Sequence, residues 1–307
     1  MNELVTDIKS LEIETLKNLK NSKAANTLRA YNSDFKDFSI FCSKNNFSFL
    51  PTDPKIIALY LTHLSKTSKF STLKRRIASI SVVHKLKGHY IDTKHPLIIE
   101  NLLGIKRKIG SNQKAKKPIL ISDLKEIINV INKHKIKKDR KLRDKALILI
   151  GFSGGFRRSE LVDIDFEDVE FVREGVKIFV KRSKTDQSGE GMTKAIPSFN
   201  NSYYCPVLHL QDWMTTKDLK KGKVFPLSDK SVALIVKKYA NLAGLDGNKY
   251  AGHSLRSGFA TSTAESGAEE RNIMSMTGHK TTQMVRRYIQ EANLFKNNAL
   301  NKIKIKI

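Results

Sequence analysis

Apolar residues recur every three or four positions in the first third of the chain, for example at Leu28, Tyr31, Phe35 and Phe38. This spacing places them on one face of a helix, so it predicts helices throughout residues 24–109, where four fit. One of these helices is expected to begin with Asp53 as its N-cap and Pro54 at its first position. The next two are expected to follow Ser71-Thr72 and Pro96.

The pattern changes after residue 109. Helical spacing near residues 122–134 and 140–154 precedes a stretch rich in β-branched residues. Turn signals at Glu174-Gly175 and over residues 186–191 predict a small antiparallel sheet there, before helices resume. The sequence therefore predicts a mainly α fold with a small antiparallel β-sheet in the C-terminal domain. The expected division is an N-terminal extension (1–23), a helical domain (24–109), an exposed basic linker (110–117) and a second domain with a C-terminal tail (118–307).

The chain is strongly basic, because 56 Lys and Arg residues face 30 Asp and Glu residues and give a formal net charge of +26. A positive surface of this extent favours a nucleic acid, whose phosphates it would neutralise. An anionic membrane is the competing partner, but no Lys-rich amphipathic helix with an aromatic face stands out. The residues expected to contact nucleic acid are Lys74, Arg75, Arg76, Lys106, Arg107, Lys114, Lys116 and Lys117.

Composition argues against several other classes of protein. The longest apolar stretch, residues 146–152, is seven residues, far below the ~20 that cross a membrane. The N-terminus has no apolar signal segment, so a cytoplasmic protein is expected. Cys42 and Cys205 lie far apart, without CxxC spacing or a histidine cluster, which argues against disulfides and a zinc site. Neither a metal nor another cofactor is expected.

Two groups of residues in the second half could bind an anion. Arg157 follows a glycine pair at the start of a predicted helix, and an arginine there opposes the helix dipole, which indicates a bound anion. The alternative is a local ion pair with Glu160. His253 and Arg256 share one helix face, so an imidazole and a guanidinium could converge on one phosphate.

Two further groups could supply proton transfer and a nucleophile. Lys184 lies at a predicted turn between strands, where it could enter a cleft or serve only solubility. Tyr288 follows His279 by nine residues and neighbours two arginines that could lower its pKa. The alternative for this tyrosine is an ordinary core position.

Together these groups supply what metal-free phosphodiester cleavage requires. In order and spacing the sequence resembles the tyrosine recombinase, or phage integrase, family over nearly all of its length. The motifs that carry the resemblance are Gly-Phe-Arg-Arg-Ser-Glu-Leu at 155–161, Arg-Ser-Lys-Thr at 182–185, Gly-His-Ser-Leu-Arg at 252–256, Gly-His at 278–279 and Arg-Arg-Tyr-Ile at 286–289. With about 20 residues before the first predicted domain, the plan is similar to that of the Cre and Xer proteins and implies a mobile-element integrase.

The resemblance implies roles for individual residues. Tyr288 would attack the scissile phosphate, and Arg157 and Arg256 would hold its non-bridging oxygens. His253 would assist proton transfer and bind the phosphate, and Lys184 would protonate the leaving 5′ oxygen. His279 would donate a hydrogen bond to the phosphate, and Glu160 would orient Arg157. Arg158 competes with Arg157 on alignment, and Lys181 and Lys194 compete with Lys184.

The resemblance also implies partners and an assembly. Double-stranded DNA at specific recombination sites would be held between a core-binding domain and a catalytic domain. Four protomers would exchange strands through a Holliday junction, with the tail docking on a neighbour through Leu294, Phe295 and Leu300, unless these residues pack on their own subunit.

Three alternative functions remain open. The same residues would suit a type IB topoisomerase that relaxes DNA without exchanging strands. A catalytically silent DNA-binding protein of this fold is a second alternative. A metal-dependent nuclease or transposase is the third, using an acidic patch of Asp163, Asp165, Glu167 and Asp168 that otherwise forms a solvated turn.

Overall fold

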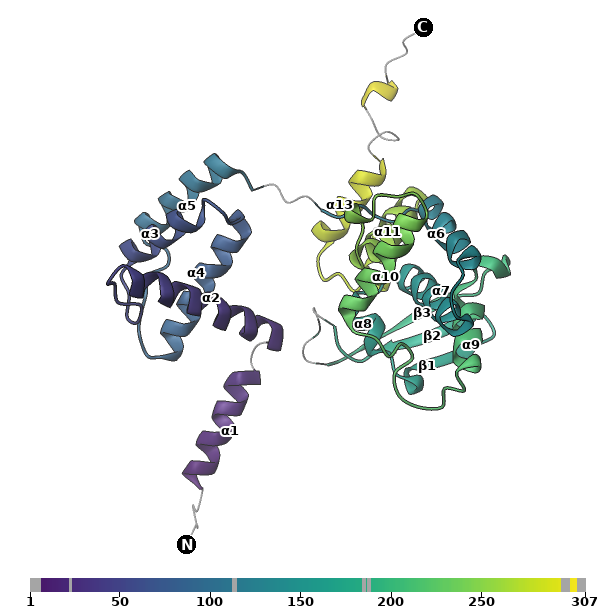
Figure 1. The fold of residues 1–307 in the computed structure, drawn as a ribbon, viewed down its shortest axis with the longest axis horizontal. Coiled ribbons are helices and arrows are strands. Elements are labelled where there is room, and N and C mark those ends of the chain that lie inside the picture. Colours follow the sequence, from purple (N-terminus) through teal and green to yellow (C-terminus); the bar gives the residue numbers. More distant parts are fainter. Residues whose placement is uncertain are drawn as a thin grey trace. The chain divides into compact units, whose positions relative to one another are not determined.

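The structure is a computed structural model that describes residues 7–21, 24–111, 115–183, 186, 189–293 and 299–302. The chain divides into two compact units, residues 1–114 and 115–307 (Figure 1). Helices dominate both units, and unit 2 also contains a three-stranded antiparallel sheet. This confirms the predicted fold class. Of the predicted functional residues, Lys114 and Lys184 lie outside the described residues.

Unit 1 is helical in its described part. Its helices are α1 (Ile8–Asn21), α2 (Ala25–Lys44), α3 (Pro54–Leu64), α4 (Phe70–Leu86) and α5 (Pro96–Ile109). Helix α2 packs on α4 and α3 packs on α5. Between them lies an apolar core that includes the fully buried Phe38, Ile57, Leu61, Leu73 and Ile98. The four helices predicted for residues 24–109 are therefore confirmed, whereas α1 was not predicted.

The helix starts in unit 1 test the predicted capping residues. Asp53 caps α3, because its Oδ1 accepts a 2.7 Å hydrogen bond from the backbone N–H of Lys55. Helix α5 begins at Pro96, as expected. Helix α4 begins at Phe70, so the prediction that it follows Ser71-Thr72 was wrong. Its N-cap residue is Lys69, which makes no side-chain cap, and the two hydroxyl residues lie within the first turn instead.

Unit 2 combines helices with a small sheet. The helices are α6 (Ile121–Lys133), α7 (Lys138–Ser153), α8 (Arg158–Asp163), α9 (Pro206–Thr216), α10 (Asp229–Leu242), α11 (His253–Glu265), α12 (Glu270–Thr277) and α13 (Thr282–Asn293). Short 3-10 turns are η1 (Phe166–Asp168), η2 (Ser202–Tyr204), η3 (Gly247–Lys249) and η4 (Ala299–Lys302). Helix α7 packs against both α9 and α11, and α13 packs on α11.

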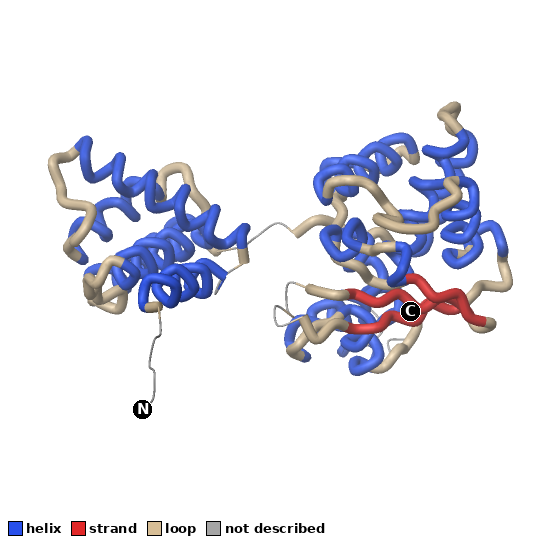
Figure 2. The backbone as a smooth tube through the Cα atoms, turned by 90° about the horizontal axis from the view of Figure 1, so that it is seen from below, coloured by secondary structure: helices blue, strands red, loops and turns tan. Residues whose placement is uncertain are grey.

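The sheet has the order β1 (Val169–Val172), β2 (Gly175–Val180) and β3 (Met192–Pro197), and it lies at one side of unit 2 (Figure 2). Val176 pairs with Phe171 on one side and with Ile196 on the other. Alternate residues of β2 and β3 are buried in the main core, as the period of two in a strand requires. The predicted antiparallel sheet is thereby confirmed.

The residues just before α6 are bound to unit 2. The backbone N–H of Lys117 donates to the carbonyl oxygen of Lys249 at 2.8 Å. Nζ of Lys116 donates to the carbonyl oxygen of Asn248 at 2.5 Å. The last three residues of the predicted linker, 115–117, thus belong to unit 2. Among the residues described, no helix combines the length and the apolar character that crossing a membrane requires.

Candidate active site

A glycine turn fixes the position of Arg157. Helix α7 ends at Ser153, and the turn that follows holds Gly155 at φ +54°, a left-handed conformation that glycine adopts without strain. A Cβ atom at this position would also lie only 2.9 Å from Cδ1 of Phe259. The chain then buries Phe156 and places Arg157 as the N-cap residue of α8.

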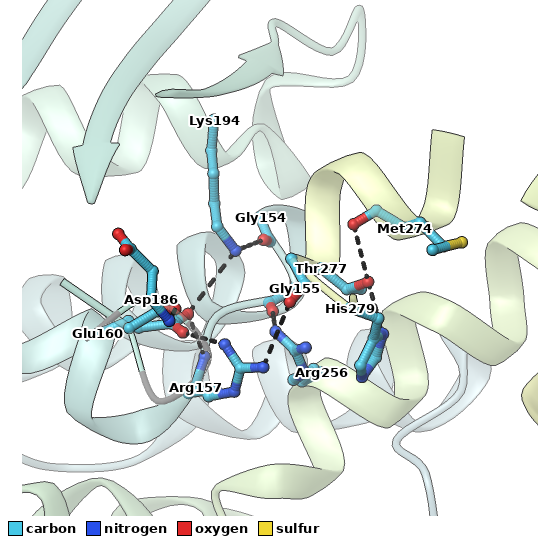
Figure 3. A network of polar contacts seen from close by, with 12 residues as sticks. Gly154, Gly155, Arg157, Glu160, Asp186, Lys194, Arg256, Met274, Thr277 and His279 are labelled. Atoms are coloured by element: carbon cyan, nitrogen blue, oxygen red, sulfur yellow. Dashed lines mark hydrogen bonds and ion pairs between the residues drawn. The ribbon is translucent and has the colours of Figure 1, made fainter. Parts of the chain in front are cut away.

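Arg157 is held by Glu160 through both its backbone and its side chain (Figure 3). Its backbone N–H donates to Oε2 of Glu160 at 2.9 Å, and its Nη1 donates to Oε1 at 2.5 Å. Its Nη2 lies 3.5 Å from the carbonyl oxygen of Gly278, on the far side of the site. The ion pair weighed from the sequence therefore exists, with Glu160 buried. The competing Arg158 is 40% exposed and pairs with Asp229 instead.

Arg256, on α11, is fully buried. Its Nη1 donates to the carbonyl oxygen of Gly155 at 2.9 Å, while its Nε and Nη2 have no hydrogen-bond partner among the described residues. Burial, followed by the nearby charge of Arg157, lowers the pKa of this guanidinium to about 10. Leaving buried donors of a charged group unpaired is costly, so the site is arranged to receive an acceptor.

Both arginines line one pocket of about 670 Å³. His253, the first residue of α11, is exposed and lines the pocket one turn from Arg256, so the predicted sharing of a helix face is what the structure shows. The other residues that line it are Arg158, Ser159, Asp229, His279, Gln283, Met284, Arg287 and Tyr288.

His279 enters the pocket from the end of α12. The helix stops at Gly278, which has φ +62° in the left-handed region. The imidazole is 6% exposed, and its Nδ1 lies 2.7 Å from Oγ1 of Thr277. Burial and then the charges of Arg256 and Arg157 lower the pKa of His279 to about 4, so the ring is neutral at pH 7.

Tyr288 projects from α13 and is half-buried. Its ring packs against a small apolar cluster of Ala260, Ala264, Ile273 and Val285. Its centroid lies 6.1 Å from that of His279. Burial raises the pKa of the phenol, and the charges of Arg256 and Arg287 oppose that shift. Tyr288 is thus both a packing residue, as one alternative held, and a pocket residue.

The lysines that compete with Lys184 have different surroundings. Lys181 pairs with Asp165 and Asp168 at 2.8 and 3.0 Å, and these hydrogen bonds raise its pKa. Lys194, on β3, is completely buried. Its Nζ donates to the carbonyl oxygen of Gly154 at 2.8 Å and lies 3.8 Å from Oε2 of Glu160. Of these two lysines, only Lys194 reaches the residues that hold the arginines.

Comparisons of sequence identify the group of proteins to which the chain is related. The sequence profile of the phage integrase family matches residues 119–294. An integrase/recombinase XerD homologue of Selenomonas ruminantium is 41% identical over 98% of this chain and 92% of its own length. The chain belongs to the phage integrase family. By enzyme class it is a site-specific tyrosine recombinase.

Other members of the family are more distant. A tyrosine recombinase of Agathobacter rectalis is 26% identical over 87% of this integrase-family chain and 86% of its own length. Solved structures of the XerH recombinase on a palindromic difH substrate and of a lambda integrase dimer on a core site have the same fold, with TM-scores of 0.62 and 0.59 and 18% identity in each case. The XerH match covers 81% of this chain and 73% of the XerH chain. The lambda integrase match covers 96% of this chain and 98% of the lambda integrase chain.

Three of the four carboxylates in the acidic patch of this integrase-family chain pair with lysines. Lys223 contacts Asp163 at 2.7 Å and Asp165 at 3.1 Å, and Lys181 contacts Asp165 and Asp168. In the described part of the chain, no group of three or more His, Cys, Asp or Glu side chains could hold a metal ion. These aspartate–lysine pairs hold the turn that leads into β1.

The predicted nucleic-acid contacts of unit 1 differ in their availability. Lys74, Lys106 and Arg107 are exposed. Arg75 is 45% exposed and lies 3.1 Å from Oδ1 of the buried Asp34. Arg76 is only 15% exposed, and its Nη1 contacts both the carbonyl oxygen and the carboxylate of Asp34. Arg76 therefore stabilises the packing of α4 on α2.

Proposed function

We propose that this recombinase cuts and rejoins DNA through a covalent 3′-phosphotyrosyl intermediate on Tyr288. The phenolic oxygen gives up its proton with the assistance of His253, attacks the scissile phosphorus and forms a P–O bond. The bond to the 5′ oxygen breaks, and that oxygen leaves with a proton from Lys184. The observation that carries this proposal is the buried Arg256, whose Nε and Nη2 lack partners among the described residues in a pocket that also contains Tyr288.

The arginines supply the electrostatic stabilisation. Guanidinium groups are planar and permanently charged, so Arg157 and Arg256 can hold the two non-bridging oxygens as negative charge builds on them. Glu160 orients Arg157, and the carbonyl oxygen of Gly155 orients Arg256. His253 binds the phosphate at the exposed side of the pocket and assists proton transfer, and His279 contacts the phosphate from the side of Tyr288.

The leaving oxygen receives its proton from Lys184 in this proposal. Support comes from the position of β3, the strand that follows Lys184 in the sequence. A Cβ atom built on Gly278 would lie 3.1 Å from Sδ of Met192, so the start of β3 adjoins the turn that carries His279.

DNA is the proposed partner, at specific sites, and a tetramer is the proposed active assembly. The XerH and lambda integrase structures contain DNA substrates, and this chain has a formal charge of +26. Exposed Lys74, Lys106 and Arg107 would contact phosphates from the core-binding domain. Four protomers would exchange one pair of strands through a Holliday junction before the other. Of the residues expected to dock on a neighbour, Leu300 is 66% exposed, and Leu294 and Phe295 lie outside the described residues.

The test is covalent capture in the absence of free metal ions. Wild type, Tyr288→Phe and the control Tyr203→Phe are each incubated in EDTA with a supercoiled plasmid carrying the DNA that flanks the gene. Wild type and the control are expected to yield SDS-resistant protein joined to DNA, and Tyr288→Phe none. An adduct with Tyr288→Phe would mean that another nucleophile acts.

A second plasmid distinguishes recombination from relaxation. With two copies of the flanking DNA in one circle, the proposal predicts recombinant circles. Relaxed plasmid without recombinants would favour the activity of a type IB topoisomerase. Loss of the wild-type adduct in EDTA would instead favour metal-dependent chemistry.

A further inference from the structure

Lys194 lies beneath the proposed active site but has no role in the chemistry described above. It comes from β3, and its side chain is completely buried although it ends in an amino group that is ordinarily charged. Its inward direction follows from the strand, in which Lys194 and Ile196 are both buried while Thr193 and Ala195 are exposed. A buried lysine is costly to retain, so its contacts call for an explanation.

The amino group of Lys194 lies beside Glu160, which holds Arg157, and contacts the residue next to the one that holds Arg256 (Figure 3). Nζ donates to the carbonyl oxygen of Gly154, the residue before the Gly155 carbonyl that accepts from Arg256. It also lies 3.8 Å from Oε2 of Glu160, whose other oxygen accepts from Arg157. The ring of Phe156, within the same turn, lies 4.3 Å from Nζ. The side chain of Lys194 thereby connects β3 to the turn at residues 154–156 and to the carboxylate of Glu160.

Three basic side chains surround Glu160. Lys194, Arg157 and Arg256 all act on this single carboxylate, and His279 adjoins them. The carboxylate of Asp186, drawn in the same network in Figure 3, accepts from the backbone N–H groups of Gly189, Glu190 and Gly191. An anion between the arginines would offset the repulsion between their two guanidinium groups.

Burial lowers the pKa of Lys194 to about 7, with Glu160 opposing the shift and the two arginines adding to it. An anion in the pocket would favour the charged form of the lysine, because it offsets the repulsion from Arg157 and Arg256. Binding of the anion would therefore draw a proton onto Lys194.

We propose that Lys194 is a positioning residue for Arg157 and Arg256, and that anion binding between these arginines is coupled to proton uptake by Lys194. The inference rests on the proposed function, which gives the arginine pair a phosphate to bind. The coupling would make the arginines best ordered when a phosphodiester is present.

Sulfate tests the coupling without any DNA, because sulfate does not titrate near neutral pH. Calorimetric titration at pH 8, in buffers that differ in ionisation enthalpy, measures the protons taken up per sulfate bound. Wild type is expected to take up a measurable fraction of a proton. Lys194→Met, which keeps the length of the side chain without its charge, is expected to bind sulfate at least tenfold more weakly and to lose this uptake.

Two further variants control the measurement. Lys177→Met removes an exposed lysine from the neighbouring strand β2 and should leave binding and uptake unchanged. Lys194→Arg should bind sulfate with only the proton uptake that the histidines contribute, because a guanidinium stays protonated. This variant gives the result if Lys194→Met fails to fold. His253 and His279 also face the pocket and can take up protons when sulfate binds, so the proton uptake of each variant is compared with that of wild type. Equal uptake in wild type and in the folded Lys194 variants, or no sulfate binding by wild type, would overturn the proposal.

Covalent capture then separates this inference from the proposed function. Lys194→Met should form the DNA adduct at least tenfold more slowly, with unchanged affinity for the plasmid. Tyr288→Phe should form no adduct but keep the sulfate-linked proton uptake. Failure of wild type to form an adduct would count only against Tyr288 as the nucleophile. An adduct formed at the wild-type rate by Lys194→Met would refute the positioning role of Lys194.

Discussion

Oγ1 of Thr277 lies 2.7 Å from Nδ1 of His279, within the turn that carries the imidazole into the pocket. The same hydroxyl lies 2.5 Å from the carbonyl oxygen of Ile273, to which it donates its single hydrogen. The oxygen is then free to accept from Nδ1–H, which favours the tautomer that presents Nε2 as an acceptor in the neutral ring. An anion in the pocket would favour the protonated ring, which donates from both nitrogens.

Thr277→Val should slow formation of the covalent adduct by roughly tenfold, or about 1.4 kcal/mol. The valine fills the same space but cannot fix the tautomer or the orientation of His279. Thr277→Ser keeps the hydroxyl and serves as the control, with a rate near that of wild type. Initial rates of adduct formation on the flank-bearing plasmid provide the measurement, and equal rates for the valine and serine variants would contradict the role of the hydroxyl.

Arg256→Ala should reduce the rate of adduct formation by about 10²–10³-fold, which corresponds to roughly 3–4 kcal/mol of transition-state stabilisation. The reason is that its buried Nε and Nη2 are donors held ready for the phosphate. Arg271→Ala removes an arginine that is 84% exposed on α12 and should leave the rate unchanged. A normal rate with Arg256→Ala would remove Arg256 from the chemistry.

Much of the fold could be predicted from the sequence, because the spacing of apolar residues along the chain reflects which positions are buried. The repeat that contains Phe35 and Phe38 predicted α2, and Asp53-Pro54 predicted the start of α3. Helix α1 also had a local signal, since Ile8–Asn21 is rich in Leu, Lys and Glu, which are strong helix formers. Its mixed charge obscured this signal, so the segment was expected only as an extension.

The arrangement of the site depends on contacts that local patterns do not encode. Arg256 meets Gly155 across 101 positions of sequence, and its complete burial follows from the packing of α11 on α7. Spacing predicted that His253 and Arg256 share a helix face, but not that one is exposed and the other buried. Lys194 entered only as a competitor of Lys184, although the alternation of β3 could have marked it as an inward residue.

Arg76 and Lys74, two residues apart on α4, should respond differently to substitution. Arg76→Ala should lower the free energy of unfolding by about 1–3 kcal/mol, because the buried Asp34 loses one of its partners. Lys74→Ala should leave stability unchanged, weaken binding to DNA and reduce the slope of log affinity against log salt by about 1. Urea unfolding and salt titrations of DNA binding separate the two effects. A stability loss with Lys74→Ala, or none with Arg76→Ala, would reverse the assignments.

The buried ammonium of Lys194 predicts a specific dependence of stability on pH. Its pKa is about 7 in the folded chain against an ordinary value of 10.5. Between these values the unfolded chain binds a proton at this side chain that the folded chain lacks, so the wild-type free energy of unfolding rises with pH in that window. The rise is on the order of a few kcal/mol.

Lys194→Met lacks this contribution, so its stability relative to wild type should be greatest near pH 7 and should shrink toward pH 10. Urea unfolding at pH 7 and pH 9.5 of wild type, Lys194→Met and the exposed-site control Lys177→Met measures this difference directly. If the gap between Lys194→Met and wild type does not change with pH, Lys194 keeps its proton in the folded chain without anion, and the site would bind phosphate with no proton exchanged at this lysine.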